Sequence, residues 1–376
     1  MFIPALLLLS LCAAAAAIAP SLSCSSQGLC FASGLSTGAV LQRGPERAAL
    51  YGSVTGAPGA LVSVRLASVD GAYAATFNAT AAEDLTWKVL LDARPMGGNY
   101  TARATCSHGC TGRTAVAIAD LTFGEVIITL GQSNAWLPLW FTYERNDTLR
   151  AVLAGNYTNL RLWRGGLGKL QGPTHSGNWV GPEGGEPGSD PGDALTNQWR
   201  HPLDVATVQI RASEPWLFEF PAFAWYTAQH LTDLLVGTPD EGLPMGLMTV
   251  PVGGTMLEEW SAPTTQLQCR NVTCMCMGSQ DCNPYQPLDA NCTGNGALWW
   301  GNTQPFVNIT LRHFWFYQGE VRGSEPQHLR APTFFRAFTP LHAHTPPHAP
   351  HCHRTTFSTT RATLPSARAM RASSLP

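Results

Sequence analysis

The chain has 376 residues, of which 44% are hydrophobic and only 13% are charged, and its formal net charge at pH 7 is −2. A chain of this length can form two domains with substantial hydrophobic cores. The near-neutral charge excludes a basic face for nucleic acid and a strongly acidic surface. Function must therefore be sought in local motifs.

The amino-terminal stretch is apolar, with a leucine run followed by an alanine run, and Ala17-Ile18-Ala19 resembles a small-residue cleavage site. This pattern predicts a signal peptide over residues 1–19. An uncleaved anchor is the alternative, but it would need about 20 strongly apolar residues, which this alanine-rich stretch barely reaches. No later segment is apolar enough to form a stable membrane span, so we expect a secreted protein or one in the lumen of the secretory or lysosomal pathway.

Several asparagines stand in the Asn-x-Ser/Thr acceptor pattern for N-linked glycans. They are Asn78, Asn99, Asn146, Asn156, Asn271, Asn291 and Asn308. A set of this kind is typical of a glycoprotein that passes through the secretory route.

The cysteines also indicate an oxidising compartment. Cys24 with Cys30, and Cys106 with Cys110, form close pairs that predict local disulfides. Five more cysteines lie between residues 269 and 292, where zinc is the competing interpretation. Their Cys-x4-Cys-x-Cys spacing lacks the paired two-residue spacing of zinc sites, so we favour disulfides and expect no metal.

Residues 29–122 contain short segments of alternating polarity, at 61–66, 72–77 and 87–91, separated by glycine, proline and aspartate turns. Alternation with a period of two predicts strands, so residues 29–122 have an all-β pattern.

Phe123-Gly124 is expected to end this all-β pattern. Beyond it, strand-like runs such as 160–163 alternate with a helix-like stretch at 222–235. This alternation predicts an α/β domain over 124–340. Two segments rich in glycine and proline or in cysteine and asparagine, at 165–191 and 269–292, are interpreted as loop insertions near the mouth of a site.

The apolar run at 126–130 ends in Gly131, and Ser133 follows two residues later. A buried strand that ends in glycine indicates a turn that needs a residue without a Cβ. Open α/β folds keep their active sites at the carboxyl ends of their strands, which makes Ser133 a candidate nucleophile. The alternative is that Ser133 only caps a helix.

Two further strand-like runs end in polar or glycine-rich turns. Gln318 follows the apolar run at 311–317, and Gly253-Gly254 follows the run at 246–252. Acyl transfer needs a nucleophile and fixed hydrogen-bond donors around the developing oxyanion. A serine, glycine amides and a side-chain amide at three strand ends match that requirement.

Three motifs in this order, Gly131-Gln132-Ser133-Asn134, residues 253–260 (Gly-Gly-Thr-Met-Leu-Glu-Glu-Trp) and residues 316–320 (Phe-Tyr-Gln-Gly-Glu), resemble the sialate O-acetylesterase family of SGNH-type carbohydrate esterases. The resemblance covers residues 29–340. It implies an α/β fold in which a flavodoxin-like, three-layer SGNH hydrolase domain follows a small all-β sandwich domain over 29–122. It also implies a serine esterase that hydrolyses O-acetyl esters on sugars, above all sialic acids, without any cofactor.

The resemblance assigns roles residue by residue. Ser133 would be the nucleophile and Glu320 a supporting carboxylate. The oxyanion hole would consist of the Ser133 N–H, an N–H of the Gly253-Gly254 turn, with Gly254 as the catalytic member, and the Gln318 side chain. Further residues are expected to line the substrate cleft: Gln132, Asn134, Gly253 and Trp260, with Trp136 and Trp140 as additional aromatic candidates.

The family takes its general base from an Asp-x-x-His motif downstream of the Gln-Gly-Glu strand, and this chain contains no such motif. A serine hydroxyl without that base loses many orders of magnitude in rate. Residues 341–376 are rich in His, Pro and Arg and predict a disordered tail, although a metal-binding histidine tract is an alternative. We interpret the tail as a misread frame or a splice variant that leaves the α/β domain incomplete.

Two alternatives to an active esterase follow. The first is a catalytically inactive, secreted carbohydrate-binding relative that keeps the fold without the base. The second is a product that does not fold, because a sheet that lacks its last strands exposes an unpaired edge.

Overall fold

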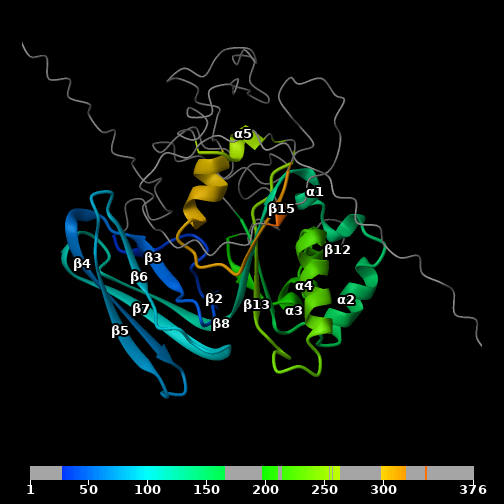
Figure 1. Cartoon of the computed structure of the whole chain (residues 1–376), viewed down its shortest axis with the longest axis horizontal. Helices are drawn as coiled ribbons and strands as arrows, with labels where there is room; N and C mark the ends of the chain where they lie inside the picture. Colours follow the sequence, from blue (N-terminus) through cyan, green and yellow to red (C-terminus); the bar gives the residue numbers. More distant parts are fainter. Residues whose placement is uncertain are drawn as a thin grey trace, which may run out of the picture. The chain divides into compact units, whose positions relative to one another are not determined.

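The computed structural model describes residues 28–165, 197–210, 214–253, 255, 257–262, 298–318 and 335–336. Within these residues, strands form a ten-stranded, a three-stranded and a two-stranded sheet (Figure 1). The predicted signal peptide, Cys24, the cysteine-rich insertion, most of the glycine-rich insertion and the carboxyl-terminal tail lie outside the described residues.

The strands up to the first site motif are β1 (Cys30–Phe31), β2 (Val40–Gln42), β3 (Ala49–Ser53), β4 (Gly56–Ser68), β5 (Ala74–Thr80), β6 (Thr86–Leu90), β7 (Gly97–Cys110) and β8 (Ala115–Gly131). The later strands are β9 (Leu160–Arg164), β10 (Trp199–Arg200), β11 (Gln209–Ile210), β12 (Glu214–Pro215), β13 (Met245–Thr249), β14 (His313–Tyr317) and β15 (Phe335–Arg336). The helices are α1 (Ser133–Trp136), α2 (Arg145–Leu153), α3 (Pro202–Thr207), α4 (Ala222–Leu234) and α5 (Leu257–Trp260). Shorter helical turns are η1 (Leu139–Phe141), η4 (Trp216–Glu219), η5 (Trp299–Thr303) and η6 (Gln304–Phe306).

The strands predicted before residue 122 are present as β4, β5 and β6. β4 pairs antiparallel with both β5 and β7, and β7 pairs antiparallel with the first half of β8. Val62, Val64 and Leu66 of β4 are buried, whereas the alternate residues Leu61 and Arg65 are exposed. This alternation is the period-two pattern of a strand with one face in the core. The disulfide between Cys106 and Cys110, predicted from their spacing, is present and links two residues near the end of β7.

β8 passes without a break through the boundary predicted between the two domains. Its first half pairs with β7 and β2, and residues from Glu125 onward pair in parallel with β13 and β14. Gly124 was expected to help end the β segment. A Cβ at Gly124 would instead lie 2.0 Å from the carbonyl oxygen of Pro244, so this glycine permits a close backbone approach inside a continuous strand. A separate all-β domain is not confirmed, and the division at 122–124 stays a prediction.

The carboxyl-terminal half of β8 lies in a parallel sheet of order β9-β13-β8-β14, with β10 and β15 antiparallel at its two ends. The predicted α/β class is confirmed by this arrangement and by the helices between the strands. If the four parallel strands are numbered by their order in the chain, their order across the sheet is 2-3-1-4. This differs from the 2-1-3-4 order of a flavodoxin-like sheet, because β13 lies between β8 and β9.

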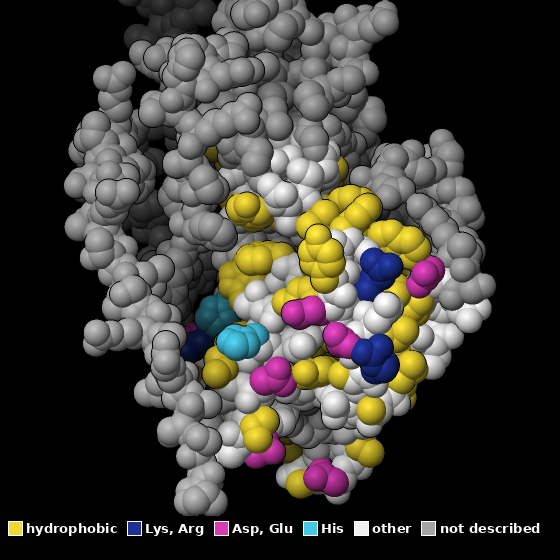
Figure 2. Space-filling view, turned by 90° about the vertical axis from the view of Figure 1, so that its right-hand side faces the viewer, with side chains coloured by type: hydrophobic (Ala, Val, Ile, Leu, Met, Phe, Trp, Pro, Cys, Tyr) yellow, Lys and Arg dark blue, Asp and Glu magenta, His cyan; other side chains and the backbone are white. Residues whose placement is uncertain are grey.

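Helices α2, α3 and α4 cover one face of the parallel sheet (Figure 1). Ile127 of β8 and Leu247 of β13 point into that helical side together with Trp225 of α4. The helix predicted at 222–235 is confirmed as α4. Phe141 and Leu153 are among the hydrophobic side chains that remain exposed in the described residues. Figure 2 shows exposed hydrophobic side chains interspersed with acidic, basic and histidine side chains. No helix among the described residues is long and apolar enough to cross a membrane.

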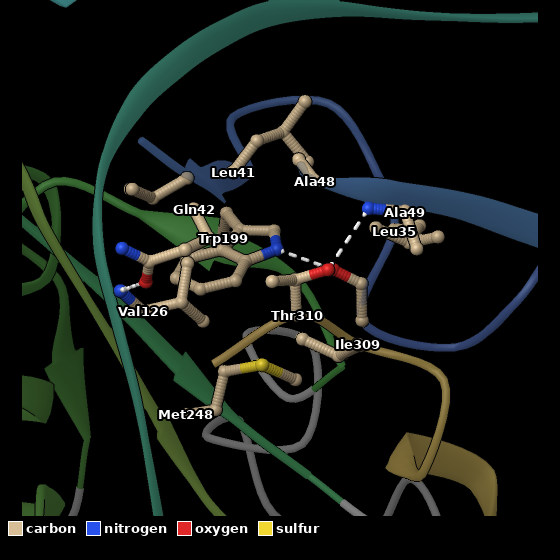
Figure 3. Close-up of a pocket in the computed structure, with 12 residues that line it drawn as sticks. Leu35, Leu41, Gln42, Ala48, Ala49, Val126, Trp199, Met248, Ile309 and Thr310 are labelled. Atoms are coloured by element: carbon tan, nitrogen blue, oxygen red, sulfur yellow. Dashed lines mark hydrogen bonds between the residues drawn. The ribbon is translucent and has the colours of Figure 1, made fainter. Parts of the chain in front are cut away.

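The opposite face of the sheet packs against the amino-terminal segment rather than against a second layer of long helices. Val126 of β8, Met248 of β13 and Leu41 meet in this packing (Figure 3). They belong to a hydrophobic cluster that also contains Leu50 and Phe306. The fit leaves a cavity of only ≈ 10 Å³, about the smallest space that holds one water. Within the described residues, strands and short helical turns cover this face, and the three-layer arrangement that the resemblance implies is not confirmed.

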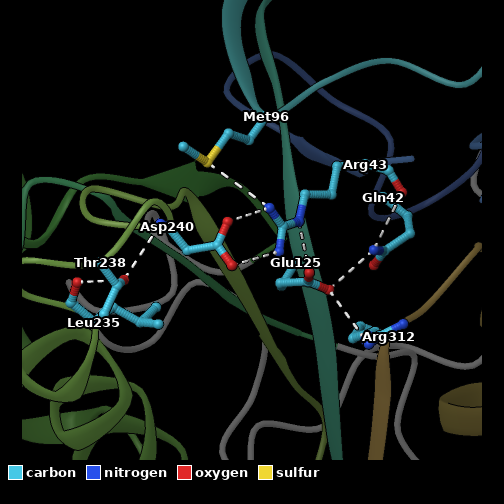
Figure 4. Close-up of polar contacts among 8 residues, drawn as sticks. All are labelled: Gln42, Arg43, Met96, Glu125, Leu235, Thr238, Asp240 and Arg312. Carbon is cyan, nitrogen blue, oxygen red and sulfur yellow. Dashed lines mark hydrogen bonds and ion pairs between the residues drawn. The ribbon is translucent and has the colours of Figure 1, made fainter. Parts of the chain in front are cut away.

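A polar network joins the elements at the amino-terminal edge of this sheet (Figure 4). Arg43 donates to Glu125 at 2.8 Å and to Asp240 at 2.7 Å, and Gln42 donates to Glu125 at 3.0 Å. Arg312 approaches Glu125 at 3.8 Å. The hydrogen bond from Arg43 holds the pKa of Asp240 below its ordinary value. The network links Glu125 within β8 to the end of β2 and to the segments that precede β13 and β14.

Candidate active site

Ser133 lies directly beyond the carboxyl end of β8, as the first residue of α1, and it is exposed. Gly131 precedes it with φ at +126°, and a Cβ at this position would lie 1.9 Å from the carbonyl oxygen of Tyr317. The Gln132 N–H donates to that same oxygen at 3.1 Å. The prediction that this turn requires a residue without a Cβ is confirmed, because the backbones of β8 and β14 touch here.

Helix capping is not the role of the Ser133 hydroxyl. The N-cap of α1 is Gln132, and no side chain caps the helix. The Ser133 Oγ instead donates to the Gln132 Oε1 at 3.0 Å, and the Gln132 side chain is buried. A buried amide therefore orients a hydroxyl that solvent can reach.

The segment after β13 brings Gly253 against Ser133. The Val250 N–H donates to the Thr129 carbonyl at 3.0 Å, and the Val252 N–H donates to the Gly131 carbonyl at 2.9 Å. These bonds carry the chain alongside β8 to its end. An added Cβ at Gly253 would lie 3.9 Å from both the Cα and the Cβ of Ser133. The main chain of this turn is therefore adjacent to the candidate nucleophile.

Gln318 reaches the same place from β14. Tyr317 pairs with Gly131 at the end of the β8–β14 ladder, so the next residue lies beside the turn of Ser133. The Gln318 side chain is buried, and its Nε2 donates to the Thr255 carbonyl at 2.6 Å. Its Oε1 is buried and has no hydrogen-bond partner among the described residues. One N–H of the amide is used by the Thr255 carbonyl, and an amide nitrogen carries a second N–H donor.

The structure thus brings together Ser133, Gln132, Gly253 and Gln318, and Asn134 is exposed next to Ser133. Gly254 and Glu320, predicted as a catalytic amide and a supporting carboxylate, lie outside the described residues.

The three tryptophans predicted to contact sugar differ in their exposure. Trp260 is only 4% exposed, and its indole N–H donates to the Thr255 Oγ1 at 3.0 Å, so its ring offers no open face for a sugar. Trp140 is partly buried against the helical core, and Arg145 lies 5.4 Å from the centre of its ring. Trp136 is partly exposed, although its indole nitrogen is buried without a hydrogen-bond partner in the described part of the chain.

Two buried polar residues near the turn were not expected from the sequence. The Thr255 side chain is fully buried, and Asn302 donates from Nδ2 to the Val250 carbonyl at 2.9 Å. Neither has a signal in the sequence, apart from the position of Thr255 directly after the double glycine. Both bind backbone carbonyls of the segment that follows β13.

The described residues supply no proton acceptor for Ser133. Four of the histidines are described, and none of them hydrogen-bonds the Ser133 hydroxyl. His313 begins β14, four residues before Tyr317, so the strand separates it from the site by about 13 Å. His201 lies 3.8 Å from Asp120. The amide oxygen that Ser133 contacts can orient the hydroxyl but is far too weak a base to take its proton.

No protein-family model matches the chain. Among curated proteins it is 26% identical over 293 residues to a sialate O-acetylesterase of Homo sapiens, covering 78% of this chain and 49% of that protein. It is 24% identical over 315 residues to a sialate O-acetylesterase of Mus musculus, covering 78% of this chain and 52% of the mouse protein. The resemblance predicted from the motifs is confirmed, and the chain spans about half the length of the curated relatives it matches.

Among solved structures, the chain is similar to a carbohydrate acetylesterase from Xanthomonas citri, with a TM-score of 0.49 and 20% sequence identity. That similarity covers 77% of this chain and 51% of the bacterial protein.

Proposed function

We propose that the chain is a carboxylic ester hydrolase that removes O-acetyl groups from sugars through an acyl-Ser133 intermediate. The observation that carries the proposal is the convergence of three strand ends, which sets an exposed serine beside the turn at Gly253 and the Gln318 amide. The curated relatives, which are named sialate O-acetylesterases, support the same chemistry.

In the proposed reaction the Ser133 Oγ attacks the carbonyl carbon of the acetyl group, and a base accepts the Oγ proton. The tetrahedral intermediate collapses with cleavage of the bond to the sugar oxygen, which takes up that proton. Water then attacks the acetyl-serine, releases acetate and restores the hydroxyl. The Ser133 N–H, an N–H of the Gly253-Gly254 turn and the second N–H of Gln318 Nε2 would hold the oxyanion, and one such donor is typically worth about 10²–10³ in kcat.

The general base must come from outside the described residues. A histidine in one of those segments would accept the Ser133 proton at neutral pH. If none does, the site keeps only its donors and its substrate contacts, which alone give about 10³–10⁴-fold over water. The magnitude of the acetate-release rate therefore distinguishes a complete site from one that lacks its base.

For the substrate we propose O-acetylated sialic acid, because the relatives are named for it. Acetate release should be measured with the full-length chain on O-acetylated sialic acid and, in parallel, on acetylated xylan. The expected result is release from the sialic acid that disappears in Ser133→Ala. Release from xylan alone would change the substrate, and equal release by Ser133→Ala would overturn the esterase proposal.

We also propose that the chain is a glycoprotein of the secretory route. Of the sequon asparagines in the described ranges, Asn78, Asn99, Asn146 and Asn156 are exposed. Asn308 is partly buried, and its Oδ1 accepts a hydrogen bond from Lys88 at 3.0 Å. The disulfide at Cys106 fits the same compartment. Expression in secreting cells should yield a product in the medium that shifts in mass on glycosidase treatment, and an unmodified product retained in the cytosol would contradict the proposal.

A further inference from the structure

We infer that Thr255 is a positioning residue of the site, with Trp260 as the group that holds it in place. The inference rests on the proposed function and deepens it, because it concerns how the turn at Gly253 is fixed against Ser133. Neither side chain would touch the substrate. Both would act through the backbone of the turn that is expected to donate to the oxyanion.

The hydroxyl and the backbone carbonyl of Thr255 are both hydrogen-bonded. Its hydroxyl donates to the Val252 carbonyl at 2.8 Å and accepts from the Trp260 indole N–H at 3.0 Å. Its own carbonyl accepts from the Gln318 amide at 2.6 Å. Thr255 is fully buried, so these three bonds form where water cannot replace them.

The bond from Thr255 closes the turn, because it spans three residues back to Val252. Val252 is then held from both sides. Its N–H donates to the Gly131 carbonyl at 2.9 Å, and its carbonyl accepts from Thr255. Gly131 lies two residues before Ser133. These two hydrogen bonds of Val252, referred to below as the clamp, therefore connect the turn to the strand end that precedes Ser133. Gly253 follows Val252 directly and is the residue that lies against Ser133.

Trp260 links this clamp to the third strand end. Its ring packs edge-on against Phe316 of β14, with the ring centres 5.9 Å apart. Phe316 stands two residues before Gln318. Trp260 therefore fixes the Thr255 hydroxyl relative to the strand from which the side-chain donor comes. Through Thr255 and Trp260, the donors from β13 and β14 are held in one arrangement relative to Ser133.

Loss of the Thr255 hydroxyl would leave the Val252 carbonyl and the Trp260 N–H without partners in a buried place. The turn would relax to find other partners, and its N–H groups would move relative to the acyl oxygen. A misplacement of about 1 Å at a reacting centre costs up to about 10²-fold in rate. Because the oxyanion forms only in the transition state, the loss should fall on kcat and leave KM nearly unchanged.

The test compares Thr255→Val, which keeps the shape without the hydroxyl, with Thr255→Ser, which keeps the hydroxyl. Trp260→Phe removes the indole N–H while keeping an aromatic ring. Thr249→Val is the matched control, because the Thr249 hydroxyl is also buried and donates to a carbonyl, that of Trp163 at 3.3 Å, away from the turn. For each variant, kcat and KM for acetate release are measured, together with amide hydrogen exchange in a peptide that contains Val252 and Gly253.

We expect Thr255→Val and Trp260→Phe to lower kcat by about 10–100-fold with KM within about twofold of the wild type. Amide exchange in the turn should rise in both, and Thr255→Ser should restore kcat and protection. The inference is overturned if Thr255→Val keeps the wild-type kcat and exchange, or if Thr249→Val loses as much kcat. If the wild-type chain releases no acetate, that result refutes the proposed function. Amide exchange then decides the positioning role alone, and unchanged protection in Thr255→Val overturns it.

Discussion

Gly131 offers the sharpest test of the site's architecture, because its replacement acts where β8 meets β14. In Gly131→Ala the new Cβ would start 1.9 Å from the Tyr317 carbonyl oxygen, whereas ordinary contact begins at 3.4 Å. One of the two strands must therefore move by about 1.5 Å, the difference between these distances. The strained backbone of an L-residue at φ +126° adds about 1–3 kcal/mol, and the loss of the Gln132–Tyr317 hydrogen bond adds about 1 kcal/mol.

The expected total is about 2–4 kcal/mol of stability, or roughly 5–15 °C in Tm for a domain of about 200 residues. Thermal unfolding measures it, and the labelling rate of Ser133 by a fluorophosphonate measures the accompanying misalignment. Gly71→Ala is the matched control, because Gly71 has φ at +75° and an added Cβ there meets nothing within 4 Å. It should cost only the left-handed backbone term of about 1–2 kcal/mol. If Gly131→Ala is no more destabilising than Gly71→Ala, the described contact between β8 and β14 is wrong.

Three further predictions concern the oxyanion donor, the polar network and the disulfide. Gln318→Ala should lower kcat for acetate release by about 10²–10³, and an unchanged kcat would remove this amide from the oxyanion hole. Arg43 holds the pKa of Asp240 below its ordinary value, so the ion pair contributes fully above about pH 4 and is lost as pH falls through the lowered pKa. Urea midpoints should therefore fall less steeply between pH 4 and pH 2 in Arg43→Met than in the wild type, and equal slopes would contradict this. Replacing Cys106 and Cys110 together by alanine should cost about 2 kcal/mol in urea unfolding, the loop entropy of a five-residue ring, and no loss would show that the crosslink does not restrain the unfolded chain.

The local parts of the site could be predicted from sequence because each depends on neighbouring residues. The apolar run before Gly131 predicts the strand, and the glycine predicts the turn. Both are present in the structure, with Ser133 directly after the turn. The helix at 222–235 was likewise visible in its own stretch of sequence and is present as α4. These signals are short-range, and the sequence displays them directly.

The missed features depend on residues that are distant in sequence. Gly124 resembles the end of a strand, and only the neighbouring Pro244 backbone shows that it permits close approach within one. In the sequence, Thr255 does not differ from other polar residues. Its contact with Gln318, which lies 63 positions later and donates to its carbonyl, is visible only in the structure. Trp260 was assigned to an open cleft by its type, whereas the partner that holds its indole N–H is Thr255. The strand order also differs from the flavodoxin-like order that the resemblance implies, because periodicity does not determine which parallel strand lies beside β8.

The central claim is that Ser133 is a nucleophile in a site where three strand ends meet. Covalent labelling tests this claim most directly. The full-length chain and Ser133→Ala would be incubated with a fluorophosphonate, digested and mapped by mass spectrometry. The account predicts one adduct, on the peptide that contains Ser133, which is absent from the variant. No adduct on the wild-type chain, or an adduct on another serine that persists in Ser133→Ala, would contradict it.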